Sequence, residues 1–224
     1  MRVKTTTMET DRLIAEIVAH GKPVARPWPV GKRTVVTLAL SLVVLALTVW
    51  IYGVRPELPQ LLRDPRFVIA ELASITTGIA AIYACFRSAL PDAPRWVPAL
   101  PLAPFALWVA MLGSGCLDEF LRAPDAMHLG TSFECLNTIV LTSIPPALVM
   151  IVMLRRVVPF HPAAVAAMGA LGVSSLASAA LTLFHPLNSA AMVLIWHLGT
   201  ILLVVIGASL FSRPLLRDWR SEPL

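Results

Sequence analysis

The sequence lacks the charged residues that cover the surface of a water-soluble domain. Only 14% of its 224 residues are charged, against roughly 25% in an average soluble domain, whereas 57% are hydrophobic and the mean hydropathy is +0.77. It also lacks a Ser-His-Asp arrangement, a glycine-rich phosphate loop and an HExxH motif. We therefore expect a protein that lies in lipid and is not an enzyme.

A cleavable secretory signal is also missing. The first apolar run begins near Val35, behind a polar arm, and is too long for the hydrophobic part of a signal peptide. The net charge of +5 and the pI near 9.6 are typical of a membrane protein with a basic cytoplasmic side. We expect this run to remain as a membrane anchor, and we expect no direct binding of nucleic acid.

Six apolar runs have about the twenty residues that a helix needs to cross a bilayer. They cover residues 35–54, 67–86, 96–116, 135–154, 163–184 and 190–211. The third is the weakest, because Pro101 and Pro104 fall in its first turns, where proline is tolerated. The sequence predicts an all-α integral membrane protein with six transmembrane helices. Residues 1–33 form an arm and spacer, 34–212 the transmembrane domain and 213–224 a basic tail.

Basic residues are distributed unevenly between the two predicted sides of the membrane. Of the 18 Lys and Arg residues, all but four fall on the side of the N-terminus, and these four are Arg55, Arg63, Arg66 and Arg122. Because short loops rich in Lys and Arg resist translocation, the basic side is expected to face the cytoplasm. Both termini are therefore predicted to be cytoplasmic.

The cytoplasmic arm divides into a short helix and a spacer. Residues 10–20 have the periodicity of an amphipathic helix. Its apolar face carries Leu13, Ile14, Ile17 and Val18, and its charged residues include Asp11, Arg12 and Glu16. Three prolines and four basic residues in 21–33 favour an extended, semi-rigid spacer. The helix either lies on the lipid headgroups or fills a groove on a soluble partner.

Several features fall within or beside the apolar runs. Pro145 and Pro146 remove two backbone donors from the fourth run and should kink or break it near Thr142. The fifth run has a stripe of small residues, a pattern that lets helices approach closely. The stripe consists of Ala166, Ala170, Ser174 and Ser178. The outer loop 117–134, with four acidic residues, is expected to act as a lid or a ligand platform.

Three polar side chains inside the predicted spans have structural and functional interpretations. Glu71, near the outer end of the second span, is expected to pair with Arg55 or Arg66, although an acidic residue at this depth is also a functional candidate. His197 either approaches the outer side or hydrogen-bonds a neighbouring helix. Cys85, alone in an apolar helix, is expected to pack.

Four segments in this order carry a resemblance to a known family. They are DRLIAEIVAHGKPVARPWP, YGVRPELPQLLRDPRF, CLNTIVLTSIPPALVMIVMLRR and LTLFHPLNSAAMVLIWHLG, and the most specific piece is Gly-x-Arg-Pro-x-Leu at 53–58. The chain resembles the NrsF family of bacterial membrane anti-sigma factors. The resemblance implies a six-span inner-membrane protein whose arm holds an extracytoplasmic-function sigma factor until an outside metal or redox signal releases it.

The chain departs from that family at the outer face. The family typically has two cysteines there, and this chain retains the first as Cys135, whereas His185 stands at the second position. A simple two-thiol switch between these positions is therefore not expected. A metal site remains compatible with the sequence, because imidazole and thiolate both bind soft or borderline ions.

The outer side therefore has three interpretations. One is a copper or similar metal site with Cys135 and His185 as core ligands and Cys116, Met127 and His128 as additions. The second is a disulfide between Cys116 and Cys135, and the third is packing alone.

We expect a relay in which a ligand or oxidation event at this cluster changes the packing of the fourth to sixth spans and the presentation of the arm. Pro145 and Pro146 are the candidate bistable element, and Glu71 is a possible coupling residue. The alternatives are a small transporter or channel for a metal ion, and an enzyme or haem protein with His185 and His197 as ligands.

Overall fold

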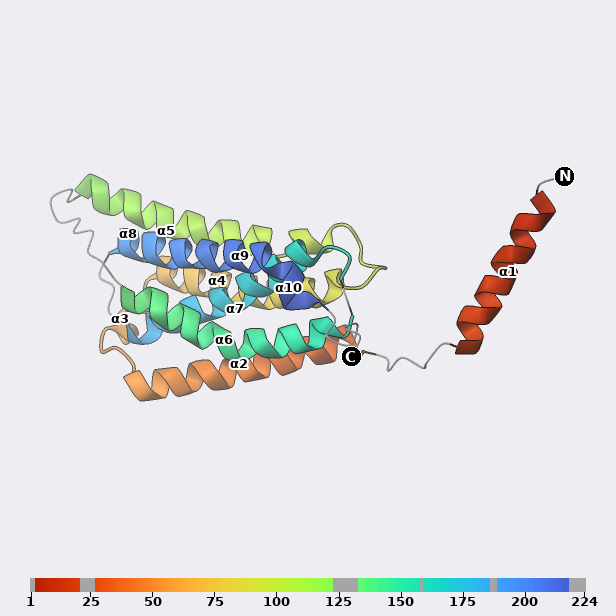
Figure 1. Cartoon of the computed structure of the whole chain (residues 1–224). Helices are drawn as coiled ribbons and strands as arrows, with labels where there is room; N and C mark the ends of the chain where they lie inside the picture. Colours follow the sequence, from red (N-terminus) through yellow and green to blue (C-terminus); the bar gives the residue numbers. More distant parts are fainter. Residues whose placement is uncertain (1–2, 21–26, 123–132, 158, 186–188, 218–224) are drawn as a thin grey trace.

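The computed structural model describes residues 3–20, 27–122, 133–157, 159–185 and 189–217. Helices make up most of this part, and Figure 1 shows them packed side by side along one direction, with α1 outside the bundle. The helices are α1 (Val3–His20), α2 (Val30–Tyr52), α3 (Leu58–Leu61), α4 (Pro65–Ser88), α5 (Leu102–Arg122), α6 (Phe133–Arg155), α7 (Pro162–Phe184), α8 (Ala190–Val193), α9 (Gly199–Leu210) and α10 (Ser212–Leu216). A 3₁₀ turn, Val97–Ala99, precedes α5, and a π-helical turn, Leu194–Leu198, joins α8 to α9.

Within the described residues, six helical segments are long and apolar enough to cross a membrane, which confirms the predicted number. They are Val30–Tyr52, Pro65–Ser88, Val97–Arg122, Phe133–Arg155, Pro162–Phe184 and Ala190–Leu210. The weakest predicted span is intact, because α5 begins directly after Pro101, whose carbonyl accepts a hydrogen bond from the Phe105 amide at 3.0 Å.

The spans alternate in direction, so the bundle has two ends (Figure 1). We call the end where α2 begins the arm end, and the end where α2 finishes the cleft end. At the arm end α2 starts at Val30, earlier than predicted, because the basic first turn is stabilised by its own contacts. Arg33 is only 2% exposed, its Nε donates to the Trp28 carbonyl at 2.7 Å, and its guanidinium lies 5.7 Å from the centre of the Phe86 ring.

Helix α7 forms the centre of the bundle and packs most extensively against α4. A Cβ atom on Gly78 would lie 2.6 Å from Leu176 Cγ, and one on Gly172 would lie 2.6 Å from Ile82 Cγ1. These two glycines therefore allow the backbones of α4 and α7 to approach closely. The predicted small-residue stripe of α7 is largely buried, but Gly172, at the closest approach, is not one of its members.

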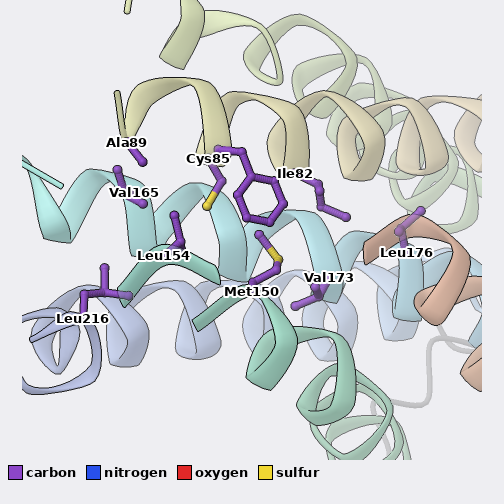
Figure 2. Packing of buried hydrophobic residues seen from close by; sticks show 10 residues of the cluster. Ile82, Cys85, Ala89, Met150, Leu154, Val165, Val173, Leu176 and Leu216 are labelled. Carbon is purple, nitrogen blue, oxygen red and sulfur yellow. The ribbon is translucent and has the colours of Figure 1, made fainter. Parts of the chain in front are cut away.

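The arm end is held together by the hydrophobic cluster in Figure 2. Ile82, Cys85 and Phe86 of α4 meet side chains of α6, α7 and α10 there. Cys85 is fully buried in this cluster, as expected of a packing residue. Helix α10 packs the first residues of the predicted tail against the bundle, because Leu216 is buried and the Leu215 carbonyl accepts a 2.7 Å hydrogen bond from Arg155 Nε.

The two prolines of α6 do not interrupt the helix. Helical structure runs from Phe133 to Arg155 with Pro145 and Pro146 inside it, so the helix does not break near Thr142, whereas the other predicted outcome, a kink, stays a prediction. Pro146 is fully buried, which shows that neighbouring helices pack against this part of α6. A role for the prolines in coupling remains a prediction.

Candidate functional site

A polar cleft of about 740 Å³ lies at the cleft end, where α4 and α8 begin and α5 and α7 finish. Eight titratable side chains line it, which is unusual for a chain with so few charges. They are Arg55, Asp64, Arg66, Glu71, Asp118, Glu119, Arg122 and His185. Its apolar lining includes Phe67 and Ala70 of α4 with Trp108, Met111 and Leu112 of α5. The cleft therefore combines charged groups with an apolar floor.

One charged group of the cleft connects α4 to α5. Arg66 forms an ion pair with Asp118, and Arg122 Nη2 lies 3.9 Å from the same carboxylate one helical turn further on. All three side chains are substantially exposed, so we expect only a small contribution to stability. Their main effect is to fix the positions of the charges at the mouth of the cleft.

A second group connects α5 to the sixth span. Glu119 accepts hydrogen bonds from Ser189 Oγ at 2.8 Å, from the Ala190 amide at 2.7 Å and from the Ala191 amide at 3.5 Å. A carboxylate at this position satisfies amides at the start of α8 and interacts favourably with the positive end of the helix dipole. The beginning of the sixth span is thereby held against α5.

Arg55 is held over the cleft by the turn that follows α2. Gly53 has a φ of 78°, a conformation that glycine adopts without strain. The Arg55 amide donates to the Leu183 carbonyl at 3.0 Å, Nη1 donates to the His185 carbonyl at 3.4 Å, and the guanidinium lies 5.6 Å from the Phe67 ring centre. Burial lowers the pKa of Arg55 from its ordinary value, and nearby Glu57 and Glu71 oppose that shift.

Glu71 does not form the predicted ion pair. Its Oε1 accepts a 2.7 Å hydrogen bond from Thr182 Oγ1 of α7, whereas Arg66 pairs with Asp118. Among the described residues Glu71 forms no ion pair with Arg55, although the two charges attract each other. Glu71 therefore connects α4 to α7 through a hydroxyl group, which satisfies one carboxylate oxygen within the span.

In the described part of the chain the two predicted core metal ligands belong to different features of the fold. Cys135 is fully buried in an apolar cluster with Ile139, Ala177 and Leu181, whereas His185 lines the cleft. Cys116 is a half-buried free thiol, so the structure contains no Cys116–Cys135 disulfide. Met127 and His128 lie outside the described residues.

No group of three or more His, Cys, Asp or Glu side chains within the described ranges is arranged to hold a metal ion. The role of Cys135 and His185 in binding a metal thus remains a prediction.

His197 hydrogen-bonds a neighbouring helix, the second of its two predicted interpretations. It is fully buried in the π-helical turn of the sixth span, and its Nδ1 lies 2.8 Å from Ser178 Oγ of α7. A buried imidazole held by a hydroxyl group in this way fastens the sixth span to α7.

Sequence reasoning missed the cleft because it placed Asp118 and Glu119 in a loop. Helix α5 continues to Arg122, so both acidic residues are helical and face α4 and α8. The spacing of Gly115, Asp118, Glu119 and Arg122 by three or four residues was the available signal, because such residues share one helix face. The partners of that face lie on other helices and could not be deduced from the spacing.

Comparison with known protein families gives one finding. A family described as NrsF, negative regulator of sigma F, matches residues 18–219, a range that contains all six spans and the cleft but only the last residues of α1. Comparisons with curated proteins and with solved structures found no match. The described part of the chain has six helices long and apolar enough to cross a membrane, and the chain belongs to the NrsF family of negative regulators of sigma F.

Proposed function

We propose that the protein is an anti-sigma factor of the bacterial inner membrane that holds an extracytoplasmic-function sigma factor on α1 and releases it on an outside signal. Family membership supports the negative regulation of a sigma factor. The excess of Lys and Arg on the side of the arm supports a cytoplasmic arm end and a periplasmic cleft end. Signal and sigma factor then act on opposite sides of the membrane.

The exposed apolar face of α1 is the observation that carries the capture of the sigma factor. Leu13, Ile14 and Val18 are 57%, 53% and 74% exposed. Ile14 and Val18 are one helical turn apart and therefore share a face. An isolated helix of this length is marginally stable in water, so docking in a groove of a partner would stabilise it as well as hold the partner.

Contacts within α4 and α2 offer a physical route from the cleft to the arm. Arg66 and Glu71 lie near the cleft end of α4, and Phe86 lies near its arm end. Phe86 packs under the guanidinium of Arg33, which in turn holds the Trp28 carbonyl just before α2. A shift of α4 would thus reach the residues that connect the bundle to α1. A tenfold change in sigma affinity needs only about 1.4 kcal/mol of difference between two states.

For the signal, we propose a soft metal ion such as copper, or an oxidant, that acts at Cys135 and His185. The chemistry of thiolate and imidazole supports this choice. Pro145 and Pro146 lie in the same helix as Cys135 and are the proposed bistable element of the relay. A metal channel is less well supported. The second cavity, of about 260 Å³, has Ser143 as its one polar residue among the described lining residues and so offers ions no polar path.

Capture by α1 is tested with two matched double variants. Ile14→Asp with Val18→Asp places two charges one turn apart on the apolar face. Ala15→Asp with Ala19→Asp places the same charges one turn apart on another face, and both alanines are exposed. In a co-purification of the full chain with cytosolic sigma factors, the first variant should lose the partner and the second should keep it. If both variants retain the sigma factor equally, α1 does not hold it through this face.

A further inference from the structure

We propose that the cleft binds an amphipathic anion, with a carboxylate or phosphate head on Arg55 and an apolar tail along the floor formed by α4 and α5. This site shares His185 with the proposed metal site but not Cys135, which is not among the residues that line the cleft. The inference goes beyond the proposed function, and its test measures binding alone.

The carboxylates of the cleft already have donors. Asp64 accepts from the Arg66 amide at 3.0 Å and caps α4, and Asp118 accepts from the Arg66 side chain. Glu119 accepts from the start of α8, and Glu71 accepts from Thr182. With these groups engaged, and with no cluster of three metal-ligating side chains in the part of the chain described, the cleft offers little to a cation.

The guanidinium groups are not equally satisfied. Arg66 and Arg122 share the carboxylate of Asp118, whereas Arg55 forms no ion pair within the described residues. Among the described residues, Arg55 Nη1 has only a long hydrogen bond, 3.4 Å, to a backbone carbonyl, and Nε is buried without an acceptor. A buried donor without a partner is costly, so Arg55 is the group in this cleft that an oxyanion would satisfy.

The orientation of Arg55 suits such a head group. Its guanidinium lies over the Phe67 ring, and its backbone amide is fixed to Leu183, so its planar fork is held before a ligand arrives. Arginine binds carboxylate and phosphate through paired hydrogen bonds in this geometry. Little side-chain freedom would be lost on binding, which favours affinity.

The floor of the cleft indicates the rest of the ligand. Trp108 is 4% exposed and packs against Phe105 with ring centres 5.8 Å apart, and Met111 and Leu112 continue the apolar lining along α5. A volume of about 740 Å³ is far larger than an inorganic anion needs. It is in the range of sites that hold medium-sized organic ligands. An anion with a hydrocarbon tail uses both the charge and the floor.

The test is photo-cross-linking of a diazirine-bearing dodecanoate to the full-length protein in nanodiscs of neutral phosphatidylcholine, with the labelled peptide identified by mass spectrometry. We expect the label on α4 and α5, and we expect its displacement by unlabelled dodecanoate or dodecyl phosphate. Acetate and dodecanol should displace it at least tenfold less well, because each lacks one half of the ligand. Labelling elsewhere, or equal displacement by dodecanol, would overturn the proposal.

Matched variants test the role of Arg55. Arg55→Gln should reduce specific labelling at least tenfold, whereas Arg63→Gln, which removes an exposed charge from the same connection, should not. Arg55→Lys keeps the positive charge but loses the planar guanidinium, so its specific labelling should lie between those of the two glutamine variants. Leu112→Asn tests the floor independently of Arg55, and it should also weaken labelling. If both proteins are fully folded, equal labelling of Arg55→Gln and Arg63→Gln would contradict an anion site at Arg55.

The source of the anion is read from a second set of nanodiscs. Phosphatidylglycerol in the bilayer should compete with the probe if the head group of a membrane lipid is the natural ligand. Undiminished labelling in its presence would assign the site to a soluble amphipathic carboxylate or phosphate. Either result supports binding of an amphipathic carboxylate or phosphate in the cleft. Loss of displaceable labelling in both bilayers contradicts such binding.

Discussion

The contact between α4 and α7 should be intolerant of even one added methyl group. In Gly172→Ala the new Cβ would lie 2.6 Å from Ile82 Cγ1, 3.0 Å from the Ile82 backbone nitrogen and 3.1 Å from the Gly78 carbonyl oxygen. The Ile82 side chain can rotate, but the two backbone atoms can move only if the helices separate. Overpacking of this kind costs about 1–3 kcal/mol. The measured loss is partly masked, because alanine favours a helix over glycine by about 1 kcal/mol.

A matched substitution removes that ambiguity. Gly207 of α9 has no other group within 4 Å of an added Cβ, so Gly207→Ala gains the same helix propensity without a clash. In reversible unfolding by sodium dodecyl sulfate in mixed micelles, Gly172→Ala should be less stable than Gly207→Ala by about 1–3 kcal/mol. Equal stability of the two variants would refute the close approach of α4 and α7.

Two further predictions concern the cleft end. Glu119→Ala removes the acceptor for the amides at the start of α8 and should lower stability by about 0.5–2 kcal/mol in the same assay. Glu57→Ala, at an exposed position, should have no measurable effect. Equal effects of the two substitutions would argue against a capping role of Glu119. Copper and zinc bound to the purified protein should fall in Cys135→Ser and persist in Cys85→Ser, since Cys85 is buried in the arm-end cluster. If the native protein carries no metal, the metal interpretation of Cys135 and His185 is wrong.

The apolar runs predicted the six spans because burial in lipid leaves a continuous local signal about twenty residues long. The same hydropathy pattern placed the start of α2 too late, because the basic residues before Val35 indicated a solvated spacer. Arg33 is instead held by a local hydrogen bond to the Trp28 carbonyl, five residues earlier, and by a non-local contact of its guanidinium with the ring of Phe86. Neither effect is visible in the hydropathy of the segment.

The cleft depends on pairings between helices, which a single sequence does not reveal. Glu71 was identified as unusual from its depth, but its partner is Thr182, an uncharged residue on α7. Arg66 was one of the two expected partners of Glu71, and it pairs with Asp118 because α5 continues to Arg122, beyond its predicted end at Cys116. His185 was identified from the family pattern and lines the cleft, whereas Cys135 packs in the apolar cluster.

The central claim is that the arm and the cleft lie on opposite sides of one membrane. Ala15→Cys in the arm and Arg63→Cys beside the cleft, both exposed positions, can be labelled with a membrane-impermeant thiol reagent in a Cys116→Ser background. We predict that spheroplasts label Arg63→Cys alone and that inside-out membrane vesicles label Ala15→Cys alone. Labelling of both positions in spheroplasts would place arm and cleft on the same side and contradict a relay across the membrane.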